Sequence, residues 1–172
     1  MTLEQMNKIK KWNLLRDNNK FDYSLETNMF NEENREFYEI YNAYLISEVL
    51  TLEAMTKMCD AHADSNFVLG GTIHKASTSV MTHKDYDHYA SILAVANHEI
   101  NLMTQFIAEI VPFGGLDLDH CLELVIEANE QKSTTRNEYG KITKPEGFIA
   151  PDQKIKEYLM ELDTAGVLCH ND

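Results

Sequence analysis

Proline is scarce in this sequence, and all of it lies in the last two-fifths of the chain. The 172 residues include only three prolines, Pro112, Pro145 and Pro151. Proline interrupts helices because it lacks a backbone N–H and clashes with the preceding turn. Residues 33–111 contain none, so this segment is free to form long helices.

Cysteine and long apolar runs are also lacking. The three thiols, Cys59, Cys121 and Cys169, are scattered and have no CxxC spacing. This pattern indicates neither a disulfide framework nor a thiolate zinc site, and it favours buried or inert thiols. The N-terminal stretch has no apolar run of the signal-peptide type, and nowhere do about 18 apolar residues follow one another, as a membrane-spanning helix would need. We therefore expect a cytosolic protein that makes no contact with a membrane.

Basic charge is the third deficit. Fifteen Lys and Arg residues stand against 28 Asp and Glu residues, which gives a net charge of −13. Such a surface disfavours binding to a nucleic-acid backbone. A free nucleotide differs, because it arrives as a magnesium complex whose metal an acidic pocket can attract. The hydrophobic content of 44% is sufficient for a packed core, and the length suits a single domain over residues 1–172.

The periodicity of the apolar residues predicts three long helices. From Glu36 to Leu50, apolar residues recur every three or four positions, which is one stripe of an α-helix. From Leu50 to Lys75 they surround the helix axis more completely, which is typical of a central, buried helix. A third helix is predicted from Asp85 to Val111, where the sequence Pro112-Phe113-Gly114-Gly115 stops it.

Two shorter helices are predicted near the C-terminus. Either Asp117 or Asp119 can cap a helix from His120 to about Lys132, and Asp152 can cap another that runs through Leu162. No stretch alternates with the period of a β-strand. The sequence therefore predicts an all-α fold, a helical bundle of four to five helices, in which Gly70-Gly71 marks a close helix contact.

Acidic residues border the apolar stripe of the first predicted helix. On an ideal helix Glu32, Glu33, Glu36 and Glu39 fall within about a third of the circumference. In a chain this acidic, such spacing also arises by chance on a solvated helix face.

A second acidic pair lies on the predicted central helix. Asp60 and Asp64 are one turn apart and are flanked by apolar residues. A carboxylate in apolar surroundings is costly unless a cation compensates it, and a divalent ion bridging two antiparallel helices would compensate several acids together. The alternative is that Lys57, tyrosine hydroxyls or helix caps satisfy these two acids.

A third element follows the acids. Asn129 and Lys132 lie one helical turn apart, just before a loop that contains Lys141 and Lys144. Amide and ammonium groups of this kind can bind phosphate or sugar oxygens. Alternatively, the pair is an ordinary helix C-terminus at which Lys132 meets the helix dipole.

The order of these three elements resembles the all-α nucleoside triphosphate pyrophosphatase superfamily, in particular its MazG-like and phosphoribosyl-ATP pyrophosphohydrolase-like branch. Residues 32–36 resemble the family's EExxE motif, and residues 60–72 resemble its second acidic helix. Within residues 127–152, Glu127-Ala-Asn129-x-x-Lys132 and the Gly140 to Asp152 loop resemble its nucleotide-binding tail. In the second motif the family commonly has ExxD, whereas Asp60 supplies the acid here and Ala61 stands three residues before Asp64. The resemblance spans about residues 31–152.

The resemblance implies a MazG-like helical bundle that hydrolyses a nucleoside triphosphate, NTP or dNTP, to the monophosphate and pyrophosphate. It implies Mg²⁺ as the cofactor, with Mn²⁺ as a substitute. The implied metal ligands are Glu33, Glu36, Asp60 and Asp64. Glu32 is an additional ligand or a base that orients water, which makes Glu32, Glu33 and Glu36 the catalytic group. The implied substrate-binding residues are Asn129, Lys132, Lys141 and Lys144.

Two further expectations complete the sequence-based picture. Few long helices in one protomer leave apolar faces uncovered, so we expect a homodimer or homotetramer. None of the seven histidines forms an HxxxH or HExxH motif, and His62 falls on the helix face opposite Asp64, so we expect structural or surface histidines. The alternative to an enzyme is a non-catalytic helical protein that binds or sequesters nucleotides or a protein partner.

Overall fold

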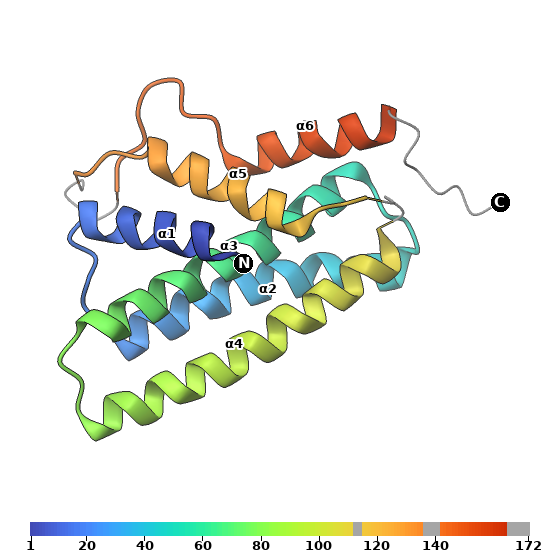
Figure 1. The fold of residues 1–172 in the computed structure, drawn as a ribbon. Coiled ribbons are helices and arrows are strands. Elements are labelled where there is room, and N and C mark those ends of the chain that lie inside the picture. Colours follow the sequence, from blue (N-terminus) through green and yellow to red (C-terminus); the bar gives the residue numbers. More distant parts are fainter. Residues whose placement is uncertain (112–114, 136–141, 165–172) are drawn as a thin grey trace.

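The protein is seen here as a computed structural model, which describes residues 1–111, 115–135 and 142–164. Over these residues the secondary structure is helical, which confirms the predicted all-α class. Figure 1 shows two long helices, α2 and α4, running beside α3, with the shorter helices on the other side of α3. The helices are α1 (Leu3–Leu15), α2 (Tyr23–Ser47), α3 (Leu52–Thr78), α4 (His83–Ile110), α5 (Leu118–Gln131) and α6 (Pro151–Thr164).

The predicted number of helices was too low, because α1 was missed. Its start carries a capping box, in which the Thr2 hydroxyl accepts a hydrogen bond from the Gln5 N–H at 3.2 Å and the Gln5 side chain accepts one from the Thr2 N–H at 2.7 Å. Only a few apolar residues then follow at helical spacing, among them the buried Ile9 and Trp12. The core therefore extends beyond residues 31–152, where the motifs lie.

Several predicted helix ends also needed correction. Helix α2 begins at Tyr23, well before Glu36, because the Asp22 side chain caps it by accepting from the Leu25 N–H at 3.0 Å. Helix α5 is capped by Asp117, one of the two predicted caps. Helix α6 begins at Pro151, so Asp152 lies in its first turn instead of preceding it.

Helix α3 is the centre of the bundle, as predicted. It packs against each of the other five helices, with α2 as its most extensive partner. The free thiols of Cys59 and Cys121 are buried in this core, in line with the expectation of inert cysteines, whereas Cys169 lies outside the described residues. Buried apolar residues of the core include Phe37, Met58, Met103, Ile107, Leu122, Val125, Ile126, Ile155 and Leu159.

The contact between α1 and α3 depends on glycine, as Gly70-Gly71 predicted. A Cβ atom on Gly70 would lie 2.9 Å from Cδ1 of the fully buried Ile9. A Cβ on Gly71 would meet Asn13 Nδ2 at an ordinary 3.4 Å. Close approach at Gly70 therefore sets the separation of the two helices.

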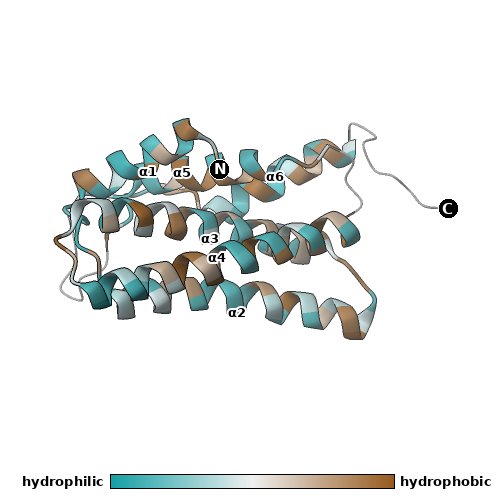
Figure 2. Ribbon diagram, turned by 60° about the horizontal axis from the view of Figure 1, so that its bottom comes forward, coloured by the Kyte–Doolittle hydropathy of each residue, from teal (hydrophilic) through white to brown (hydrophobic). Residues whose placement is uncertain are grey.

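Helix α4 has fewer neighbours. Among the described residues it packs only on α2 and α3 and does not contact α5. The predicted apolar stripe of α2 also stays partly uncovered at its C-terminal end, where Leu45 is 55% exposed. Figure 2 shows that polar and apolar residues alternate around both long helices. None of the described helices is long and apolar enough to cross a membrane.

Candidate functional site

Carboxylates from α2 and α3 meet between the two helices. Glu33 is half-buried there, and its pKa is raised to about 9 by burial first and then by the charges of Asp64, Glu36, Glu32 and Asp60. Charges act on one another over several ångströms, so these contributions put the five carboxyl groups in one region of the helix pair. The acids of the first two predicted elements therefore lie near enough to influence one another's ionisation.

The two aspartates of α3 show the same crowding. Burial raises the pKa of Asp60 to about 8, with further increases from Asp64, Asp152 and Glu36 and a decrease from Lys132. Burial also raises the pKa of Asp64 to about 6, while Lys132 lowers it. The charges of Lys132 and Glu36 thus act on both aspartates, Lys132 from the C-terminal cap of α5 and Glu36 from α2.

These aspartates are not satisfied in the ordinary way. Neither Asp60 nor Asp64 forms a hydrogen bond or ion pair with another described residue, and Asp60 Oδ1 is buried without a partner. Lys57 could have neutralised them, but its Nζ lies 3.5 Å from Glu53 Oε1 and forms an ion pair with that residue instead. Buried polar atoms without partners are rare and costly, so the alternative of acids satisfied by Lys57 finds no support here.

The acids have the donor chemistry of a site for a hard divalent cation. Mg²⁺ and Mn²⁺ prefer carboxylate oxygens, and the unpartnered oxygen of Asp60 together with the crowded acids Glu33 and Asp64 fits such an ion. Among the described residues, however, no three His, Cys, Asp or Glu side chains lie close enough together to hold one ion. Shared coordination therefore requires the carboxylates to rotate toward one another.

A lysine pair forms the cationic side of the site. Lys132 Nζ donates a hydrogen bond of 2.7 Å to Asn129 Oδ1, and burial lowers its pKa while Asp64 opposes that effect. Lys132 and Lys144 both lie near the ring of Phe148, with Nζ 5.9 Å and 5.0 Å from its centroid. The predicted Lys141 lies outside the described residues.

Asn129 itself is occupied by the protein. Its Nδ2 donates to the Val125 carbonyl at 3.0 Å, its Oδ1 accepts from Lys132, and its side chain is buried. In this arrangement Asn129 orients Lys132 and has little of its side chain free for a ligand.

Arg16 is a component of this region that the sequence did not reveal. Its guanidinium group is buried and donates to main-chain carbonyls at the C-terminal end of α5, including Asn129 O at 3.3 Å and Ser133 O at 3.1 Å. The guanidinium carbon Cζ also lies 4.6 Å from the centroid of the Trp12 ring, and Trp12 Nε1 donates to Asn129 O at 2.8 Å. Helix α1 thus fixes the end of α5 from which Lys132 projects.

Asp152 is a second residue of this region that the sequence did not assign to the site. It was predicted to cap a helix and was not among the predicted site residues, yet from the first turn of α6 its charge acts on both Asp60 and Asp64. The sequence signal was its place just after Pro151, at the end of the segment that resembles the nucleotide-binding tail.

Comparison with known proteins adds no relative. A scan against protein-family models, a search among curated proteins and a search among solved structures each gave no match for this chain.

Proposed function

We propose that this protein is a Mg²⁺-dependent nucleoside triphosphate pyrophosphohydrolase that releases a nucleoside monophosphate and pyrophosphate. One observation carries the proposal: Glu33, Asp60 and Asp64 form a crowded set of negative charges with raised pKa values and no hydrogen bond or ion pair to a described residue, and the charge of Lys132 acts on both aspartates. A metal bound to triphosphate would relieve that crowding. The order of the three sequence elements, which resembles the MazG-like branch, supports the same reaction.

The residues divide into an acidic and a basic half. Glu33, Glu36, Asp60 and Asp64 would hold the ion, which when bound would neutralise phosphate oxygens and the charge on the leaving group. Lys132, held in place by Asn129, would contact the phosphates from the opposite side, and Lys144 would assist from the loop. Lys141 remains a proposed ligand in the same loop.

Hydrolysis at the α-phosphorus requires a base. Glu32 is exposed at the edge of the acidic cluster, so it is accessible to water and would accept the proton of the attacking molecule. The bond between the α-phosphorus and the oxygen that bridges to the β-phosphorus then breaks. That oxygen leaves with pyrophosphate.

A substrate panel tests the proposal. The protein is incubated with each NTP and dNTP in Mg²⁺ and in Mn²⁺, and the products are separated by ion-exchange chromatography. We expect monophosphate and pyrophosphate in equal amounts, and no reaction in EDTA. Formation of orthophosphate as the first product would show a different reaction.

We also propose a homodimer or homotetramer. Apolar side chains at the end of α2 and in the following loop are uncovered, with Leu45 55%, Ile46 86% and Val49 61% exposed. These exposed apolar side chains are available to pack against a second copy of the chain. Light scattering that gives the mass of a single chain at all concentrations would contradict this.

The second candidate function is nucleotide binding without turnover. It is favoured by the finding that no three potential metal ligands among the described residues already share one position. Calorimetry separates the two functions, because a sequestering protein would bind nucleotide in Mg²⁺ and return it unchanged.

A further inference from the structure

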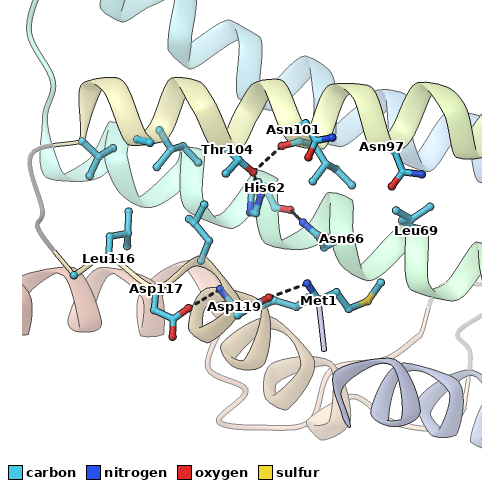
Figure 3. Close-up of a pocket in the computed structure, with 17 residues that line it drawn as sticks. Met1, His62, Asn66, Leu69, Asn97, Asn101, Thr104, Leu116, Asp117 and Asp119 are labelled. Carbon is cyan, nitrogen blue, oxygen red and sulfur yellow. Dashed lines mark hydrogen bonds and ion pairs between the residues drawn. The ribbon is translucent and has the colours of Figure 1, made fainter. Parts of the chain in front are cut away.

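A separate cavity of about 850 Å³ lies on the other side of α3 from the acids. On a helix, His62 and Asn66 project roughly opposite to Asp60 and Asp64, and both line this cavity. Its other walls come from α4 and from the start of α5, as Figure 3 shows. The cavity exists because α4 packs on α2 and α3 and, among the described residues, leaves α5 untouched.

His62 is held in the cavity wall by Thr104. Thr104 Oγ1 lies 3.0 Å from His62 Nε2 and donates to the Ile100 carbonyl at 2.8 Å. His62 Nδ1 is buried with no hydrogen-bond partner among the described residues.

Three asparagines provide further polar groups. Asn66 Nδ2 donates to the His62 carbonyl at 3.0 Å, and Asn97 Nδ2 donates to the Leu93 carbonyl at 2.7 Å, which leaves their Oδ1 atoms as acceptors. Asn101 lies one turn after Asn97 and makes no side-chain hydrogen bond to another described residue. It can therefore both donate and accept.

The remaining walls are apolar or already neutralised. Leu69 of α3, Ile100 of α4 and Leu122 of α5 are buried around the cavity. At the rim, the Asp117 carboxylate accepts from the backbone at the start of α5, and Asp119 pairs with the Met1 ammonium group at 2.9 Å. The Asp117 carboxylate is hydrogen-bonded to the backbone and Asp119 is ion-paired, so the apolar walls favour an uncharged ligand.

We propose that this cavity binds a small uncharged heteroaromatic molecule with donors and acceptors on one edge, the chemistry of a free nucleobase. The apolar side chains of Leu69, Ile100 and Leu122 receive the ring, and the free amide of Asn101 pairs with the edge. An asparagine amide matches the adjacent donor and acceptor of adenine. This ligand carries no phosphate and needs no metal, so the inference is independent of the proposed function.

Adenine, titrated into the metal-free protein in EDTA, is the probe, and the readout is the NMR signals of the asparagine side-chain amides and the His62 ring. We expect the signals of Asn97, Asn101 and His62 to shift and saturate. Asn101→Ala should weaken binding at least about fivefold, the lower limit for one bidentate amide contact. The matched control is Asn42→Ala, which changes an exposed asparagine of α2 and should leave affinity unchanged.

Four results would overturn the proposal. Adenine at millimolar concentration could leave all these signals unmoved, or it could shift only signals around Asp64, which would place binding in the acidic site. The same signals could instead shift with protein concentration alone, which would show that a second copy of the chain covers the cavity. Equal affinity for purine, which lacks the exocyclic amino group, would refute recognition of the edge by Asn101.

Discussion

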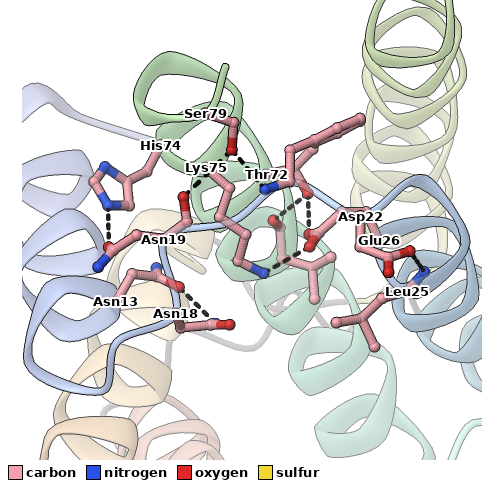
Figure 4. Close-up of polar contacts among 12 residues, drawn as sticks. Asn13, Asn18, Asn19, Asp22, Leu25, Glu26, Thr72, His74, Lys75 and Ser79 are labelled. Atoms are coloured by element: carbon pink, nitrogen blue, oxygen red, sulfur yellow. Dashed lines mark hydrogen bonds and ion pairs between the residues drawn. The ribbon is translucent and has the colours of Figure 1, made fainter. Parts of the chain in front are cut away.

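Lys75 and Glu26 form an ion pair in the interior of the protein, with 2.7 Å between Lys75 Nζ and Glu26 Oε1 and both side chains at most 3% exposed. Figure 4 shows the pair between the end of α3 and the start of α2, where the Thr72 hydroxyl also donates to Glu26 at 2.8 Å. The pair thereby ties together the ends of the two helices that carry the acidic site.

Removal of one partner of this pair should be strongly destabilising. Lys75→Met leaves the Glu26 carboxylate buried without its cation, and we expect a loss of about 3–5 kcal/mol in the free energy of unfolding. The double variant Glu26→Leu with Lys75→Met should lose less than either single variant, because no buried charge remains. Urea unfolding measures all three. The exposed Lys57, changed to Met, serves as the control and should cost under about 1 kcal/mol.

The stability of the metal-free protein should fall as pH rises from about 6.5 to about 9. In the folded state the pKa of Asp60 is raised to about 8 and that of Glu33 to about 9, whereas both groups titrate near pH 4 when unfolded. The folded protein thus holds more protons than the unfolded chain in this range, and the stabilisation present at low pH is lost as these protons leave. His62 acts in the opposite direction, but only below about pH 6.5.

Thermal unfolding in EDTA at several pH values measures this slope. Asp60→Asn should flatten it, because the variant removes one of the titrating groups. Added Mg²⁺ should raise Tm more at pH 9 than at pH 6.5 if the ion binds the ionised acids. A Tm that is constant or increases with pH in EDTA would contradict the pKa shifts.

Asp64→Asn should have opposite effects on activity and stability. If the proposed reaction is correct, loss of this ligand should lower kcat by at least about a hundredfold, beyond the usual cost of losing a residue that only supports a ligand. The same change removes a carboxylate from a crowded cluster, so the metal-free variant should unfold at a higher temperature than the parent protein. Glu109→Gln, at an exposed site on α4, is the control and should change neither property. Loss of activity together with lower stability would indicate a structural role instead.

Gly70 and Gly71 should respond differently to alanine. Gly70→Ala places a methyl group against the buried Ile9, so we expect a loss of about 1–3 kcal/mol. Gly71→Ala meets Asn13 Nδ2 only at an ordinary contact distance of 3.4 Å and should be neutral or stabilising by up to about 1 kcal/mol, the usual difference between glycine and alanine within a helix. Chemical denaturation distinguishes the two. Ile9→Val should restore part of the stability of the Gly70 variant by removing Cδ1, the atom that the new methyl group would contact.

Sequence reasoning succeeded where a local pattern determines the structure. The periodicity of α3 and α4 is long enough to predict each helix to within a few residues. The position of His62 opposite Asp64 followed from helix geometry alone. Helix α1 was missed because its few apolar residues are a weak periodic signal, even though the Thr2 and Gln5 capping box was visible in the sequence.

The parts of the site that could not be predicted depend on contacts between distant segments. Arg16 reads as an ordinary surface cation after a short amphipathic stretch, and only the approach of α1 to α5 gives it the carbonyls of Asn129 and Ser133. Asp152 likewise reads as a helix cap until α6 packs on α3. The spacing of Asn129 and Lys132 predicted a pair that binds a ligand together, but the hydrogen bond between them is an internal one.

Because every other described helix packs on α3, a fragment that lacks one of these helices is not expected to preserve the acidic face by itself. Fragments that keep Glu33 and Asp64 but lack α1, α5 or α6 would open α3 to water on the side that now buries it. The carboxylates would then titrate like those of any solvated peptide. The raised pKa values of these carboxylates are a property of the assembled bundle as a whole.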